Sequence, residues 1–99
     1  MCGVSIAEEW AAYLQGPFAL DGDDPALGDR KTELLVLDAD VAGYLALAVE
    51  RPLTDIEAQE LTAKRAWLLS AVASLPESNP TRRQMEQLAA LALRAAENR

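Results

Sequence analysis

The chain contains no histidine among its 99 residues, and it has a single cysteine, Cys2. Without histidine the protein lacks the commonest general base and the commonest protein metal ligand, so catalysis would have to use carboxylates, hydroxyls or the Cys2 thiol. One cysteine cannot form a disulfide within the chain, which is typical of proteins from a reducing compartment. These absences favour a binding protein over an enzyme.

Long apolar segments are also missing. No charge-free apolar run approaches the ~20 residues that a membrane-spanning helix needs. The N-terminus does not show the basic segment followed by an apolar one that marks a secretory signal. We therefore expect a cytoplasmic protein that does not bind membranes.

Aromatic and β-branched residues are few, whereas alanine and leucine are abundant. Because alanine and leucine lose little on entering a helix, this composition predicts an all-α fold. The length suits a single core, so we expect one helical domain over residues 1–99. We predict a small three- or four-helix bundle, mostly antiparallel, with a long acidic loop over residues 16–29 after the first helix. The predicted helices lie near residues 5–15, 31–51, 55–75 and 80–97.

Capping signals support three of these helix starts. Ser5 with Glu8, and Thr54 with Glu57, match the capping box in which each residue satisfies a backbone N–H near the start of the helix. Pro80 suits the first turn of the last helix, where its missing N–H costs nothing. The sequence therefore predicts starts near residues 5, 55 and 80.

The apolar spacing is clear in the first helix and ambiguous in the second. Ile6, Trp10, Tyr13 and Leu14 fall on one predicted face of the first helix. Residues 34–37 (Leu-Leu-Val-Leu) fit either a helix or a short extended run, after which Asp38 would cap a later helix. We prefer the continuous helix, because a lone strand would have no partner strand.

The net charge of −7 is unevenly distributed. The first 40 residues hold nine acidic residues against Arg30 and Lys31, and Asp21, Asp23 and Asp24 cluster within the acidic loop. Such a balance argues against direct binding of nucleic acid, but it permits docking on a basic protein surface. The three aspartates do not match a calcium-binding loop, and we expect no metal and no other cofactor.

Three residues of the predicted 55–75 helix do not fit a simple pattern of one apolar stripe and one polar face. Ile56 and Trp67 lie together on the opposite side of the helix, where they are either covered by another helix or exposed to a partner. Arg65 falls within the stripe itself, so it must reach solvent at the edge, pair with an acid, or face a partner.

Glu57 and Glu60 form one E-x-x-E pair. The pair resembles the one that MazG-type helical nucleotide pyrophosphohydrolases use, together with a later E-x-x-D, to hold Mg²⁺. No E-x-x-D follows here. The resemblance implies an alternative function, a carboxylate-dependent nucleotide hydrolase that uses Mg²⁺.

The sequence as a whole favours a non-enzymatic protein–protein interaction module, such as a small regulator, an inhibitor, an antitoxin-like protein or an accessory subunit. We expect it to bind a partner protein, or a second copy of itself in a homodimer, through Asp21, Asp23, Asp24, Ile56, Arg65 and Trp67. One form of this hypothesis is a nucleic-acid mimic that blocks a DNA- or RNA-binding protein through its carboxylates.

Overall fold

The computed structural model describes residues 6–16, 25 and 27–97, which form four α-helices and no strand. The helices are α1 (Ile6–Gln15), α2 (Arg30–Glu50), α3 (Asp55–Val72) and α4 (Pro80–Glu97). The predicted all-α bundle is therefore confirmed.

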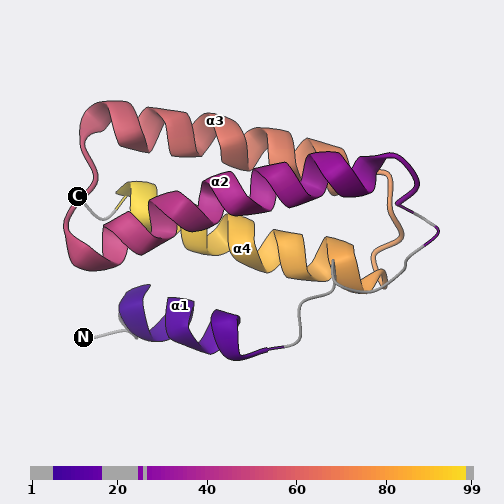
Figure 1. The fold of residues 1–99 in the computed structure, drawn as a ribbon, viewed down its shortest axis with the longest axis horizontal. Helices are drawn as coiled ribbons and strands as arrows, with labels where there is room; N and C mark the ends of the chain where they lie inside the picture. The colour runs from indigo at the N-terminus through magenta and orange to yellow at the C-terminus, as the bar shows by residue number, and fades with distance from the viewer. Residues whose placement is uncertain (1–5, 17–24, 26, 98–99) are drawn as a thin grey trace.

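Helices α2, α3 and α4 form the body of the bundle, and α1 lies along one side of it (Figure 1). The chain reverses direction between α2 and α3 and again between α3 and α4, so α3 runs antiparallel to both of its neighbours (Figure 1). Helix α1 packs against α2 and α4, and it makes no contact with α3. One side of the α2–α3 pair is therefore left uncovered by any described helix.

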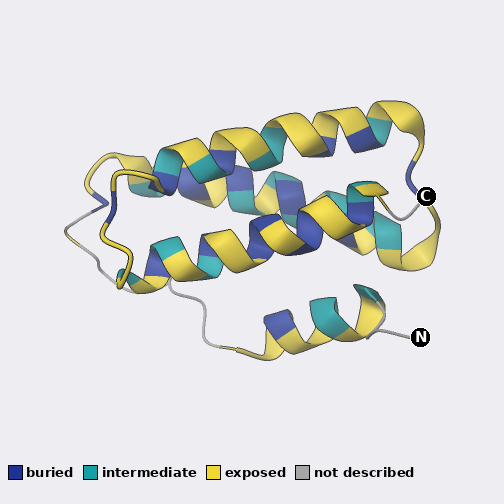
Figure 2. Ribbon diagram, turned by 180° about the vertical axis from the view of Figure 1, so that it is seen from behind, coloured by how far each residue is buried: buried dark blue, intermediate teal, exposed yellow. Residues whose placement is uncertain are grey.

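The core lies where the inner faces of the helices meet, as the buried positions in Figure 2 show. Its largest fully buried apolar residues are supplied by α2, α3 and α4, each at helical spacing. They are Leu34, Leu37, Val41, Leu45, Leu61, Leu68, Val72, Met85 and Leu88.

Residues 34–37 are helical, so the predicted continuous helix is confirmed and a cap at Asp38 is not needed. Leu34 is completely buried, whereas Val36 is 56% exposed. Consecutive residues point about 100° apart around a helix, so a run of four apolar residues in α2 cannot all reach the core.

The predicted apolar face of α1 is wrong at one residue. Tyr13 is buried and Trp10 is partly buried, but Leu14 is 61% exposed. Because α1 contacts the bundle along one side only, the stripe it can bury is narrow. Leu14 lies beyond the edge of that stripe.

Helix α3 ends at Val72, three residues before the predicted end, although Leu75 is still buried. Two carbonyl oxygens just after α3 accept hydrogen bonds from Arg82, at 3.4 Å for Ala73 and 2.6 Å for Leu75. The Oδ1 atom of Asn79 accepts from the Arg82 backbone N–H at 3.0 Å, which caps the start of α4. Arg82 therefore joins the end of one helix to the start of the next.

Parts of the sequence interpretation fall outside the described residues. Asp21, Asp23 and Asp24 of the acidic loop are among them, and so is Ser5 of the first capping box.

Candidate functional site

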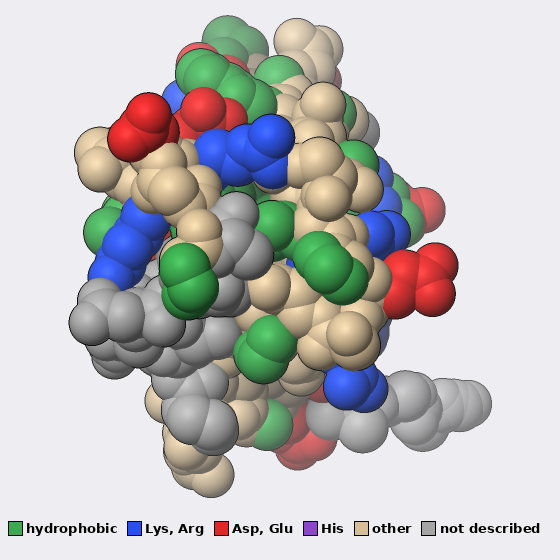
Figure 3. Space-filling view, turned by 90° about the vertical axis from the view of Figure 1, so that its right-hand side faces the viewer, with side chains coloured by type: hydrophobic (Ala, Val, Ile, Leu, Met, Phe, Trp, Pro, Cys, Tyr) green, Lys and Arg blue, Asp and Glu red, His purple; other side chains and the backbone are tan. Residues whose placement is uncertain are grey.

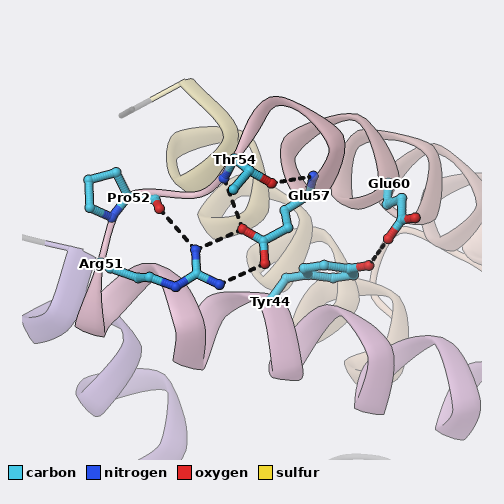
Figure 4. A network of polar contacts seen from close by, with 6 residues as sticks. All are labelled: Tyr44, Arg51, Pro52, Thr54, Glu57 and Glu60. Carbon is cyan, nitrogen blue, oxygen red and sulfur yellow. Dashed lines mark hydrogen bonds and ion pairs between the residues drawn. The ribbon is translucent and has the colours of Figure 1, made fainter.

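The connection between α2 and α3 is held by one carboxylate. Glu57 accepts from the Thr54 backbone N–H at 2.9 Å, and the Thr54 hydroxyl accepts from the Glu57 backbone N–H at 3.2 Å. The capping box predicted from the sequence is confirmed. Arg51 adds two hydrogen bonds to the same carboxylate, at 2.7 and 2.8 Å (Figure 4). These bonds lower the pKa of Glu57 to about 2, with the Arg51 guanidinium as the main cause.

A row of polar contacts continues from this point along the outer boundary of α2 and α3. We call it the α2/α3 seam, and it is made of side chains that face one another across two antiparallel helices. Its four pairs are Arg51–Glu57, Tyr44–Glu60, Asp40–Lys64 and Glu33–Trp67.

Trp67 is the large apolar residue of the seam, and 54% of it is exposed. Its indole Nε1 donates to the Glu33 carboxylate at 3.1 Å, and the Lys64 ammonium lies 5.7 Å from its ring centroid. These two contacts hold the ring in one orientation while its surface stays open. A large aromatic side chain that is already ordered loses little conformational entropy when a partner covers it.

Two other exposed apolar residues lie on the helices that form the α2/α3 seam. Ile56 is 69% exposed and is eleven residues before Trp67, which places it on the same face of α3 about three turns away. Val36 is 56% exposed and lies one turn along α2 from Glu33, which contacts Trp67. We call this set of Val36, Ile56 and Trp67 the Trp67 face.

Two acidic side chains next to the Trp67 face hydrogen-bond to neutral groups rather than to a base. Glu33 accepts from a neutral indole, and Glu60 accepts from the neutral hydroxyl of Tyr44. The hydrogen bond to Glu60 raises the pKa of Tyr44, so this hydroxyl stays protonated and neutral. Asp40, by contrast, is paired with Lys64 at 3.0 Å. The face is therefore apolar with a negative rim.

Arg65 does not belong to this face. It is half-buried, and its Nε donates to the Ala89 carbonyl oxygen of α4 at 2.9 Å. The structure brings Ile56 and Trp67 to one face of α3, whereas Arg65 points toward α4. Its position in the apolar stripe is explained by this contact between α3 and α4.

The E-x-x-E pair has partners within the protein. Both carboxylate oxygens of Glu57 bind Arg51, and Glu60 accepts from Tyr44 (Figure 4). Over the described residues, no group of three or more potential metal-binding side chains comes together. The geometry thus gives the two glutamates structural roles between α2 and α3.

The charges at one end of the bundle are mixed. Figure 3 looks at the end where α3 stops and α4 begins, and the described acidic and basic side chains there are interspersed with hydrophobic ones. The described residues of this end therefore do not form a surface of one sign.

Sequence reasoning identified Trp67 and Ile56 but missed Glu33, Asp40 and Lys64. The sequence does carry a signal, because the seam residues of α2 and its C-cap Arg51 are separated by seven, four and seven positions. This spacing keeps residues on one face of a helix. Matching them to α3 requires the register of the two helices, which the sequence does not state.

None of the described helices is long and apolar enough to cross a membrane. Comparison of the chain with family models, with curated proteins and with solved structures finds no match.

Proposed function

We propose that this chain is a non-enzymatic protein–protein interaction module that binds a basic, amphipathic segment of a partner protein on the Trp67 face. The observation that supports it is the exposed but oriented Trp67, held by Glu33 and Lys64 on the helix that also carries Glu60, whose partner Tyr44 is neutral. Tryptophan is enriched among the residues that carry most of the binding energy of interfaces.

Charge is the reason for choosing a basic partner over a second copy of the chain. Each copy carries a net charge of −7, so two copies repel one another at low ionic strength. A segment with lysine or arginine beside an apolar anchor would instead meet Glu33 and Glu60 while its apolar side covers Trp67. Self-association into a homodimer is the competing outcome.

The test uses the whole chain and two fluorescent helical peptides, one with lysine beside leucine anchors and one in which each lysine is replaced by glutamate. We expect only the lysine peptide to bind, with an affinity that falls as salt rises, because salt screens exposed charges. Trp67→Ala should weaken this binding at least tenfold, as hot-spot truncations do. Leu93→Ala is the matched control, since Leu93 is exposed on α4 and away from the seam.

Equal loss of binding in the two variants would overturn the proposed surface. Sedimentation velocity of the wild-type chain and of Trp67→Ala tests self-association. A wild-type dimer that dissociates in Trp67→Ala would show that the Trp67 face binds a second copy of the chain instead of a basic partner.

A further inference from the structure

A second region of the molecule, on the side away from α3, holds polar groups that the Trp67 face does not use. A cavity of about 210 Å³ lies where α1, α2 and α4 meet. Its apolar wall comes from Trp10, Leu14 and Ala42, and its polar side chains are Tyr13, Asp38 and Gln84. Small-molecule sites typically have this form, an apolar hollow with a few converging polar groups.

Tyr13 is nine-tenths buried, yet its hydroxyl has no hydrogen-bond partner among the described residues. A buried hydroxyl without a partner costs free energy, so such a group calls for a physical explanation. Its ring stacks on Trp10 with the centroids 5.5 Å apart, which fixes the ring at the wall of the cavity. The ring is therefore held in place at the cavity wall, and its hydroxyl oxygen is closed to solvent and has no partner among the described residues.

Among the described residues that line the cavity, Asp38 is the only charged one. It is half-buried, and it forms no ion pair with the described residues. Burial raises the pKa of Asp38, because removing a carboxylate from water disfavours its charged form. Burial also raises the pKa of Tyr13, and the Asp38 charge raises it further. A positively charged hydrogen-bond donor between them would stabilise the carboxylate of Asp38 and give the hydroxyl of Tyr13 a partner.

We propose that this cavity binds the ammonium or guanidinium group of a small organic cation, with the carboxylate of Asp38 as its acceptor and the hydroxyl of Tyr13 as a second acceptor that the ligand uncovers as it enters. The apolar body of the ligand would lie against Trp10, Leu14 and Ala42. The volume suits a ligand of few heavy atoms, since a water molecule in the liquid occupies ~30 Å³.

The cavity has a route of access. A wider groove of about 680 Å³ runs between α1 and the first turns of α4, and it shares Tyr13, Gly16 and Gln84 with the cavity. Arg83 lines this groove and not the cavity. A cation in the cavity thus meets the Asp38 charge directly, while Arg83 borders the approach.

The experiment titrates the full chain at neutral pH with phenethylamine, 2-phenylethanol and 3-phenylpropionate. Binding is followed by Trp10 fluorescence in a Trp67→Phe background, where Trp10 is the sole tryptophan. Amide chemical shifts of the wild-type chain serve as the second readout. We expect phenethylamine to bind at least tenfold more tightly than the neutral alcohol, and the acid not to bind, because hydrogen bonds to charged groups are the strong ones.

Asp38→Asn should lower amine affinity at least tenfold, and Tyr13→Phe should lower it severalfold while keeping the ring. Glu50→Gln is the matched control, because it removes one charge from the exposed end of the same helix. Circular dichroism of each variant separates loss of binding from loss of fold. Tyr13→Phe that remains folded and binds the amine like wild type would show that the hydroxyl is not a ligand contact.

Two sources could supply the cation, a free amine or a lysine side chain of another protein. Nα-acetyl-lysine amide, titrated in parallel, distinguishes them: tighter binding than phenethylamine assigns the site to a side chain, and weaker binding assigns it to a free amine. Equal affinity of amine and alcohol, or shifts that persist in Asp38→Asn, would overturn the proposal.

Discussion

Trp67 and Leu68 are adjacent in the sequence and have opposite environments, so replacing each with alanine gives a direct test of the bundle. Leu68 is completely buried, whereas Trp67 is 54% exposed. A buried leucine replaced by alanine loses its transfer free energy and leaves a cavity, which costs ~2–5 kcal/mol. The structure predicts a loss in that range for Leu68→Ala.

The loss for Trp67→Ala follows from the part of its surface that is covered. Slightly less than half of the ~250 Å² that a tryptophan can bury is covered, and at ~25 cal/mol/Å² this gives at most ~3 kcal/mol. Area-based values are upper bounds, and the vacated space opens to water, so no cavity term is added. We therefore expect a loss of ~1–2 kcal/mol, with the hydrogen bond to Glu33 included.

Urea unfolding followed by far-UV circular dichroism measures both losses without relying on tryptophan fluorescence. We expect Leu68→Ala to lose more free energy of unfolding than Trp67→Ala, although leucine is the smaller residue. A loss for Trp67→Ala that equals or exceeds that for Leu68→Ala would refute the exposed position of Trp67, and with it the proposed binding face.

Three further predictions concern α2, Glu57 and the junction of α3 with α4. Gly43→Ala should stabilise the protein by ~0.5–1 kcal/mol in thermal unfolding, because glycine disfavours a helix interior and a Cβ atom there meets nothing within 4 Å; a lower melting temperature would contradict this. The pKa of Glu57 is lower in the folded state than its ordinary value of 4.5, so its contribution to stability is present above pH ~4.5 and is lost as the pH falls toward about 2. The difference in urea midpoint between wild type and Glu57→Gln should shrink over that interval, and a constant difference would show that the carboxylate charge is not responsible. Arg82→Ala should lose ~1–2 kcal/mol in urea unfolding, because it leaves carbonyl oxygens at the end of α3 without their charged donor. Arg83→Ala should stay within ~0.5 kcal/mol of wild type, as exposed substitutions do, and similar losses for the two arginines would contradict the role of Arg82.

Features that depend on near neighbours in the sequence were predictable. The Thr54–Glu57 capping box and the start of α4 at Pro80 both follow from residues within one turn of a helix. Residues 34–37 were open to two interpretations because four consecutive apolar residues carry no period. The structure decides between the two interpretations, because these residues are helical and Leu34 and Leu37 are buried against the other helices.

Features that depend on which helices meet were not predictable. The sequence indicates Asp38 only as a possible helix cap, and its place beside Tyr13 requires α1 to pack on α2. Arg65 is recognisable in the sequence as a charge in an apolar stripe, but its acceptor is a backbone carbonyl of α4. Because every residue has a backbone carbonyl, the sequence does not indicate which one accepts this hydrogen bond.

The α2/α3 seam also bears on how the chain reaches its fold. Its four contacts join residues that are 6, 16, 24 and 34 positions apart, in order of distance from the turn. Each contact that forms shortens the loop that the next must close, so the entropic cost of each step stays small. The two helices can zip together outward from Arg51 and Glu57, and a pair built from such local contacts is expected to fold early and fast. Helix α1 packs on α2 and α4, and its contacts with α4 join residues far apart in the sequence, so it is expected to join the bundle later.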